Sequence, residues 1–204
     1  MKNIYGLLAI FLFLSVFSFA QSAPIASIGI GTSIPKADEK MQTVSGGKIS
    51  LNDVKTNKGL LVMFSCNTCP YVIKSQARTK EMMEYAVNRG FGMIIINSNE
   101  AYRKEDDSYE SMKKYAKQQG YKVPYVVDEA SETANAFGAT RTPEVFLFDG
   151  NGKLVYKGAM EDSPANPSES KQLYLKDAID NLVGGTEINP NSTRSIGCGI
   201  KRVM

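Results

Sequence analysis

The sequence contains no histidine and no tryptophan, and only three of its 204 residues are cysteines. The absence of histidine excludes Ser-His and Cys-His hydrolases and any zinc or copper site with a histidine ligand. The absence of tryptophan removes that residue's fluorescence as a reporter. Three cysteines are too few for a disulfide scaffold. The net charge is only +3, Lys2 included, which gives no sign of a nucleic-acid-binding or anionic-membrane surface. Sulfur chemistry remains prominent.

Residues 1–20 have the layout of a secretory signal peptide. Lys2 precedes an almost unbroken apolar run from Leu7 to Phe19, and small residues stand at −3 and −1 of a cut after Ala20. The run is short for a bilayer span, although an uncleaved anchor is the alternative. We therefore expect an exported protein, periplasmic or secreted, with no membrane span after cleavage. A dithiol there needs a dedicated electron donor, or else it acts as an oxidant.

The rest of the chain alternates predicted strands and helices after a polar arm at 21–40. Strands are expected at 59–64, 91–96, 125–128, 144–148 and 153–156, helices at 66–88, 108–119, 131–137 and 169–182, and a hairpin at 41–51. The order predicts one α/β domain at 41–185, a central mixed sheet flanked by helices on both faces, with an N-terminal hairpin. A tail follows at 186–204, and the charged run 103–107 is expected to be solvated.

The motif Cys66-Asn67-Thr68-Cys69 lies between a predicted buried strand and a predicted helix. A Cys-x-x-Cys pair at such a junction is the usual setting of a redox-active dithiol. The free N–H groups of a helix N-terminus favour the thiolate, which is the nucleophile. If Ser65 or Cys66 caps the helix, Pro70 falls in its first turn, Cys66 is exposed and Cys69 is partly covered. Two inert buried cysteines are the alternative.

With these motifs, residues 40–185 resemble the thioredoxin-fold redoxins, which include exported thioredoxin-like and AhpC-TSA-like proteins. The markers are the dithiol motif and Thr142-Pro143 before the hairpin at 144–153. The resemblance implies a cis-proline at Pro143 facing the dithiol and a Thr142 backbone that binds an extended substrate.

The expected function is thiol–disulfide exchange, in which Cys66 attacks a substrate disulfide and Cys69 resolves the mixed disulfide. No cofactor is required. The expected partners are a disulfide-containing protein or a small thiol substrate, and an electron-donor thiol protein.

The sequence departs from the thioredoxin pattern at the carboxylate that lies six residues before the first cysteine, where it has Leu60. Glu144, next to Pro143, is a candidate for proton transfer, because a carboxylate in a partly apolar site can accept a proton near neutral pH. A solvated strand-end charge is the equally weighted alternative.

Two other functions are consistent with the motif. Cys69-Pro70 resembles the peroxide-attacking cysteine of peroxiredoxins, but the positions of their two helper residues hold Cys66 and Pro143, and Arg141 is out of register. A metal chaperone is the third hypothesis, since Cu(I) accepts two thiolates, although such chaperones of this fold also use a histidine.

Cys198 lies between Gly197 and Gly199 in the tail, a pattern that indicates a tight turn. The segment is expected to fold back on the domain. Cys198 is then either an extra resolving thiol or a small packed residue, and the passive role is slightly favoured.

Overall fold

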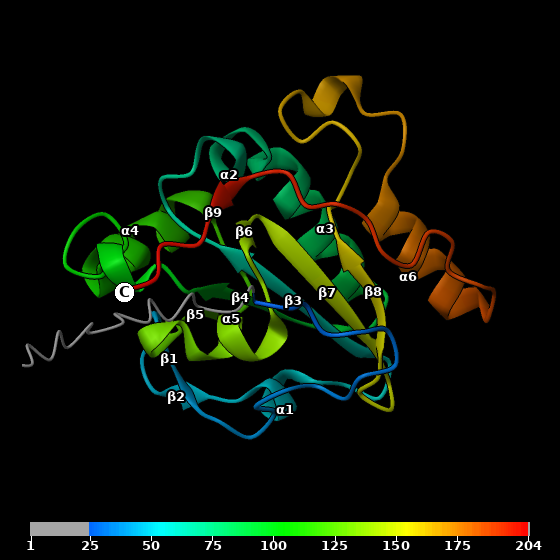
Figure 1. Ribbon diagram of the computed structural model, residues 1–204, viewed down its shortest axis with the longest axis horizontal. Coiled ribbons are helices and arrows are strands. Elements are labelled where there is room, and N and C mark those ends of the chain that lie inside the picture. The colour runs from blue at the N-terminus through cyan, green and yellow to red at the C-terminus, as the bar shows by residue number, and fades with distance from the viewer. Residues whose placement is uncertain (1–24, 204) are drawn as a thin grey trace, which may run out of the picture.

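A mixed seven-stranded sheet in the order β2-β1-β5-β4-β3-β7-β8 forms the centre of the molecule (Figure 1). This computed structural model describes residues 25–203, so the expected signal peptide at 1–20 lies outside the described residues. The predicted mixed sheet, with helices on both faces and an N-terminal hairpin, is confirmed.

The strands are β1 (Met41–Thr43), β2 (Lys48–Ile49), β3 (Gly59–Ser65), β4 (Gly92–Asn97), β5 (Tyr125–Val127), β6 (Arg141–Thr142), β7 (Glu144–Asp149), β8 (Leu154–Gly158) and β9 (Cys198–Gly199). The helices are α1 (Leu51–Val54), α2 (Pro70–Lys74), α3 (Gln76–Asn88), α4 (Tyr109–Gln119), α5 (Glu132–Phe137) and α6 (Tyr174–Gly184), with 3-10 turns η1 (Glu100–Tyr102), η2 (Glu129–Ser131) and η3 (Pro167–Glu169). Strands β6 and β9 form a separate two-stranded ribbon.

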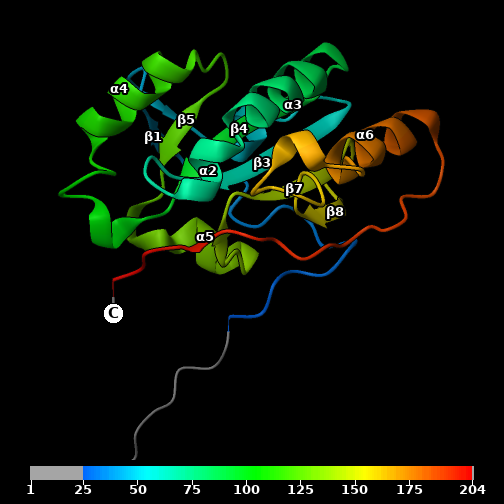
Figure 2. The same cartoon turned by 90° about the horizontal axis from the view of Figure 1, so that it is seen from above.

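Every residue of β3 and β4 is buried, because both faces of the sheet are covered. Helices α3, α4 and α6 pack on one face, and α1, α5 and the arm pack on the other. Figure 2 shows α3, α4 and α6 along one side of the sheet and α5 along the opposite side. Continuous apolar runs thus predict the central strands correctly.

Two helices begin later than the sequence predicts. The predicted helix 66–88 starts only at Pro70 and is interrupted at Ser75, because β3 extends to Ser65 and leaves the dithiol motif in the connecting loop. The last helix starts at Tyr174. Before it, the Asp162 carboxylate accepts the N–H of Lys171 at 3.1 Å, which holds that residue outside the helix.

The two terminal segments extend along the domain instead of leaving it. In the arm, the N–H of Ile28 donates to the carbonyl of Phe137, and Gly31 donates to Leu154. The tail, red in Figure 1, runs from α6 past β8, where Thr193 donates to Lys157, and reaches the start of α2 as β9. The tail therefore passes the dithiol and continues toward η1, where Ala101 donates to the carbonyl of Lys201.

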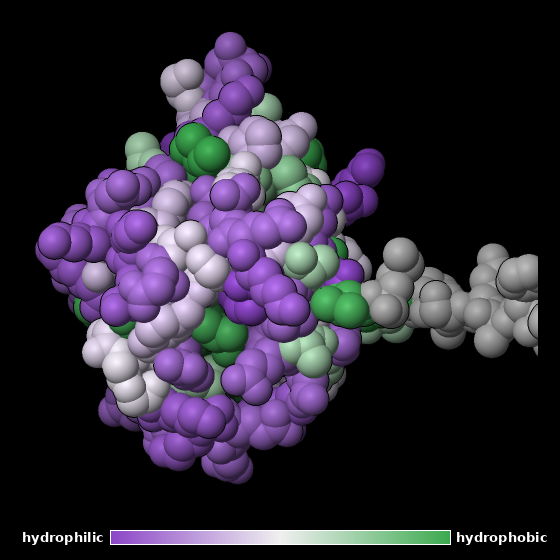
Figure 3. All heavy atoms as spheres, turned by 90° about the vertical axis from the view of Figure 1, so that its left-hand side faces the viewer, coloured by the Kyte–Doolittle hydropathy of each residue, from purple (hydrophilic) through white to green (hydrophobic). Residues whose placement is uncertain are grey.

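The surface in Figure 3 is predominantly hydrophilic, with hydrophobic residues scattered over it. Within residues 25–203, no helix combines the length and apolar character that crossing a membrane requires.

Candidate active site

The dithiol lies where β3 ends and α2 begins. The last residue of β3, Ser65, pairs with Asn97, and Cys66 follows directly. Cys69 is the N-cap of α2, and Pro70 occupies its first helical position, where its missing N–H costs nothing. Cys66 is 2% exposed and Cys69 4%. The expectation that Cys66 sits exposed at a helix start is therefore wrong, because it lies in the loop before the helix.

A buried carboxylate holds the loop between the two cysteines. The backbone N–H of Asn67 donates to Asp107 Oδ1 at 2.9 Å, and its side-chain amide donates to the carbonyl of Asp106 at 2.8 Å. Asp107 also accepts from the side chains of Asn97 at 2.7 Å and Asn99 at 2.8 Å. Three N–H donors thus satisfy a carboxylate that is fully buried.

The role of Asp107 corrects the expectation that the run 103–107 is solvated. Arg103 is also half-buried and donates to the carbonyls of Asp107 and Asn97, both at 2.8 Å. Lys104, Glu105 and Asp106 are exposed as expected, whereas the two end residues turn inward because the polar residues at the end of β4 need partners. In the sequence, the polar residues Asn97, Ser98 and Asn99 at the end of a buried strand were the signal that polar partners are needed there.

Thr142 and Pro143 lie beside the dithiol, and the peptide bond between them is cis. The carbonyl oxygen of Thr142 is 3.2 Å from Cys69 Sγ and accepts its S–H. The hydroxyl of Thr142 is 3.5 Å from Cys66 Sγ. One residue therefore contacts both sulfurs, through its backbone and its side chain.

The two thiols ionise as a pair. The hydrogen bond from Cys66 lowers the pKa of Cys69 to about 4, and the same bond, with burial, raises the pKa of Cys66. The Thr142 carbonyl opposes charge on Cys69, since a carbonyl oxygen only accepts. The first proton is therefore lost readily from the pair and the second is retained, so that one thiolate is shared between two sulfurs.

The third cysteine reaches the same place. Strand β9 pairs antiparallel with β6, with Cys198 opposite Thr142, and the half-buried Cys198 packs against the dithiol. Burial, and to a smaller extent a hydrogen bond with Cys69, raises the pKa of Cys198 to about 11. Cys198 thus remains a thiol and donates to Cys69.

A pocket of about 180 Å³ opens beside the sulfurs. Its lining includes Cys66, Thr68, Cys69, Asn99, Tyr102 and Lys201. The space is sufficient for a small disulfide, a thiol or a peroxide.

Glu144 is neither solvated nor hydrogen-bonded to a sulfur among the described residues. It is 9% exposed and accepts the backbone N–H groups of Thr140 at 2.8 Å and Arg141 at 3.0 Å. In the sheet, Glu144 pairs with Phe64 of the neighbouring strand β3. Through these contacts Glu144 stabilises the loop before the cis-proline.

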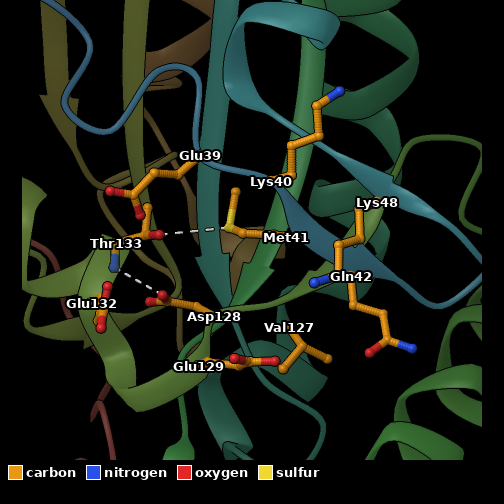
Figure 4. A pocket seen from close by; sticks show the side chains of 10 residues that line it. All are labelled: Glu39, Lys40, Met41, Gln42, Lys48, Val127, Asp128, Glu129, Glu132 and Thr133. Carbon is orange, nitrogen blue, oxygen red and sulfur yellow. Dashed lines mark hydrogen bonds between the residues drawn. The ribbon is translucent and has the colours of Figure 1, made fainter.

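A second pocket, of about 130 Å³, lies between β1 and α5 (Figure 4). Its buried Asp128 accepts the N–H groups of Thr133 and Ala134 at 2.8 and 2.9 Å, and its Glu132 is paired with Lys36. These acids support the start of α5. Between residues 25 and 203, no group of three or more histidine, cysteine or acidic side chains is arranged to hold a metal ion.

Comparisons with known proteins agree with this architecture. The family model described as Redoxin matches residues 30–174. The thiol-disulfide oxidoreductase ResA of Bacillus thuringiensis is 26% identical over 133 residues, which cover 65% of this chain and 70% of that protein. An uncharacterized conserved protein from Geobacillus kaustophilus superposes with a TM-score of 0.78 at 34% identity, covering 86% of this chain and 93% of the other. A putative thiol:disulfide interchange protein DsbE from Chlorobium tepidum shares the fold, with a TM-score of 0.57 at 19% identity and coverage of 78% and 98%.

Proposed function

Because the chain belongs to the redoxin family, we propose that it is an exported thiol–disulfide oxidoreductase whose Cys66/Cys69 pair alternates between dithiol and disulfide. The observation that carries this proposal is the contact of both sulfurs with Thr142, at 3.5 and 3.2 Å, next to a cis-proline. The similarity to a relative named thiol-disulfide oxidoreductase supports the activity, and the composition of residues 1–20 supports export.

The reaction needs no group beyond the two thiols. The pair shares one thiolate, and the reactive form carries the charge on Cys66 while Cys69 keeps its proton on the Thr142 carbonyl. In that form Cys66 attacks a substrate disulfide, which forms a mixed disulfide and releases one substrate thiolate. Cys69 then attacks Cys66 Sγ. The Cys66–Cys69 disulfide forms, the second substrate thiolate leaves, and the proton of Cys69 passes to a departing thiolate. A donor dithiol then reduces the Cys66–Cys69 disulfide to the two thiols.

The site favours small substrates in the observed conformation. The pocket beside the sulfurs holds about 180 Å³, whereas the Thr142 backbone is already paired with β9. This pocket gives small molecules an approach to the sulfurs while the tail stays on β6. An extended protein substrate must first displace the tail from β6.

Peroxide reduction is the second candidate, because the lowered pKa of Cys69 and the adjoining Pro70 fit a peroxide-attacking thiolate. However, the guanidinium of Arg141 is exposed and donates to the Gly197 carbonyl at 3.5 Å. Among the described residues, no arginine contacts the sulfurs in a way that would orient a peroxide.

The two functions are separated by exposing the reduced protein to equimolar oxidised glutathione or hydrogen peroxide, blocking free thiols and mapping the modified peptides. We expect the disulfide to produce a Cys66–Cys69 bond, and peroxide to react no faster than with an ordinary thiol. Fast, selective oxidation that starts as a sulfenic acid on Cys69 contradicts the proposal and assigns a peroxidase.

A further inference from the structure

Three cysteines pack together at this site. Cys66 and Cys69 belong to one buried cluster, and Cys198 packs against it opposite Thr142. Hydrogen bonding from both Cys66 and Cys198 lowers the pKa of Cys69. Cys69 is therefore the central sulfur, with a possible disulfide partner on each side. Two such partners are one more than a simple dithiol cycle requires.

The tail holds Cys198 in place through a series of hydrogen bonds on both sides of the site. Ile200 donates to the Thr140 carbonyl at 3.1 Å, Lys201 donates to the side chain of Asn99 at 2.9 Å, and Ile200 itself is buried. A thiol fixed beside a disulfide reacts as though at high concentration, because its positional entropy is already lost.

Gly197 allows this close approach. A Cβ on Gly197 would lie 2.2 Å from the carbonyl oxygen of Thr142, whereas a Cβ on Gly199 would meet nothing nearer than the flexible Arg141 guanidinium at 4.0 Å. Neither glycine has a positive φ, so only the contact at Gly197 requires glycine.

Access distinguishes the three cysteines. Cys66 and Cys69 are 2% and 4% exposed, whereas Cys198 is only half-buried. A donor protein therefore cannot contact the Cys66–Cys69 disulfide while β9 is in place, but it can reach Cys198.

We propose that Cys198 is a third redox residue, which transfers the oxidised state from the buried pair to the surface. This inference rests on the proposed function. After Cys66–Cys69 has formed, Cys198 loses its proton to solvent and its thiolate attacks Cys69 Sγ. The Cys66–Cys69 bond breaks, the Cys69–Cys198 bond forms, and Cys66 leaves as a thiolate, so no net electrons are gained or lost. A donor dithiol then attacks Cys198 Sγ, releases Cys69, and becomes a disulfide itself when its second thiol frees Cys198.

The test uses the full chain and its cysteine variants. Cys66→Ser protein, treated with equimolar oxidised glutathione, should form Cys69–Cys198, identified by thiol blocking and peptide mapping. Wild-type protein, oxidised and then mixed with a reduced dithiol protein such as thioredoxin, should be re-reduced about tenfold faster than Cys198→Ser, because only the half-buried third thiol is both pre-positioned and within reach of a protein donor. A Cys198 that stays free to react with the blocking agent, together with equal re-reduction rates, overturns the proposal.

The tail glycines provide a matched pair of variants. Gly197→Ala should slow formation of Cys69–Cys198 about tenfold in the Cys66→Ser background, and Gly199→Ala should not. Equal rates in the two variants contradict a relay that depends on tail geometry. If wild-type protein forms no Cys66–Cys69 disulfide at all, the oxidoreductase function fails as well; if it does and Cys198 is idle, only the relay fails.

Discussion

The carboxylate of Asp107 accepts the backbone N–H of Asn67 at 2.9 Å, although the two residues are 40 positions apart. The contact joins the loop between the cysteines to the segment before α4, and Asp107 satisfies two asparagine side chains as well. The position of the dithiol therefore depends on a residue outside the motif.

We predict that Asp107→Asn destabilises the protein. An amide has one acceptor oxygen and turns its NH₂ toward N–H donors, and each buried donor left without a partner costs about 1–3 kcal/mol. Urea denaturation measures the free energy of unfolding. The matched control is Asp106→Asn, whose side chain is exposed and whose contribution to the loop is its backbone carbonyl. Equal stability of the two variants contradicts the role of Asp107.

The Thr142 hydroxyl should affect the reactivity of Cys66. Its hydrogen bond lowers the pKa of Cys66, in opposition to the larger effects of the Cys69 bond and burial. Thr142→Val removes the hydroxyl and keeps the carbonyl, so alkylation of Cys66 by iodoacetamide at neutral pH should become slower. Peptide mapping reads the site of alkylation. Thr140→Val, an exposed position in the same loop, should leave the rate unchanged.

The ionisation of the reduced pair should appear at low pH. Because the Cys66 hydrogen bond lowers the pKa of Cys69 to about 4, one thiolate is absent below that pH and present above it. Thiolate absorbance at 240 nm, recorded against pH, measures the transition. In Cys66→Ala the principal hydrogen-bond donor to Cys69 is lost, so the midpoint of the transition should rise toward the ordinary thiol pKa of about 8.5. An unchanged transition in that variant would show that another group stabilises the charge.

Two substitutions of Glu144 distinguish a structural role of this residue from a catalytic one. Glu144→Gln keeps an acceptor oxygen for the N–H groups of Thr140 and Arg141, so turnover with a small disulfide should remain within about twofold of wild type. Glu144→Ala leaves those donors unpaired and should lower the melting temperature. A large loss of turnover in the glutamine variant, at unchanged stability, would restore proton transfer as its function.

Local pattern predicts the frame of this molecule, because segments such as 59–64 and 145–148 are continuous apolar runs in strands whose two faces are covered. The same reasoning places the dithiol between a strand and a helix, whereas the cis-proline beside it was implied only by the resemblance to redoxins. It fails at the start of α2, because the pairing of Ser65 with Asn97 extends β3 at the expense of the helix.

Distant contacts explain the rest of what the sequence did not reveal. The burial of Asp107 depends on asparagines at the end of β4, and the position of Cys198 depends on the pairing of β9 with β6. Neither pairing leaves a periodic pattern. The two glycines that flank Cys198 indicate a turn, but only the structure shows that Gly197 meets the Thr142 carbonyl.

In the proposed reaction Cys66 attacks a substrate disulfide and Cys69 resolves the product. The most direct measurement uses Cys69→Ser/Cys198→Ser protein, in which neither neighbouring thiol can resolve a mixed disulfide, and compares it with Cys66→Ser/Cys198→Ser protein. Both are incubated with oxidised glutathione and weighed intact by mass spectrometry. We predict a stable glutathione adduct on Cys66 in the first variant and little reaction in the second. An adduct that forms only on Cys69, in the second variant, rules out attack by Cys66 and makes Cys69 the attacking sulfur.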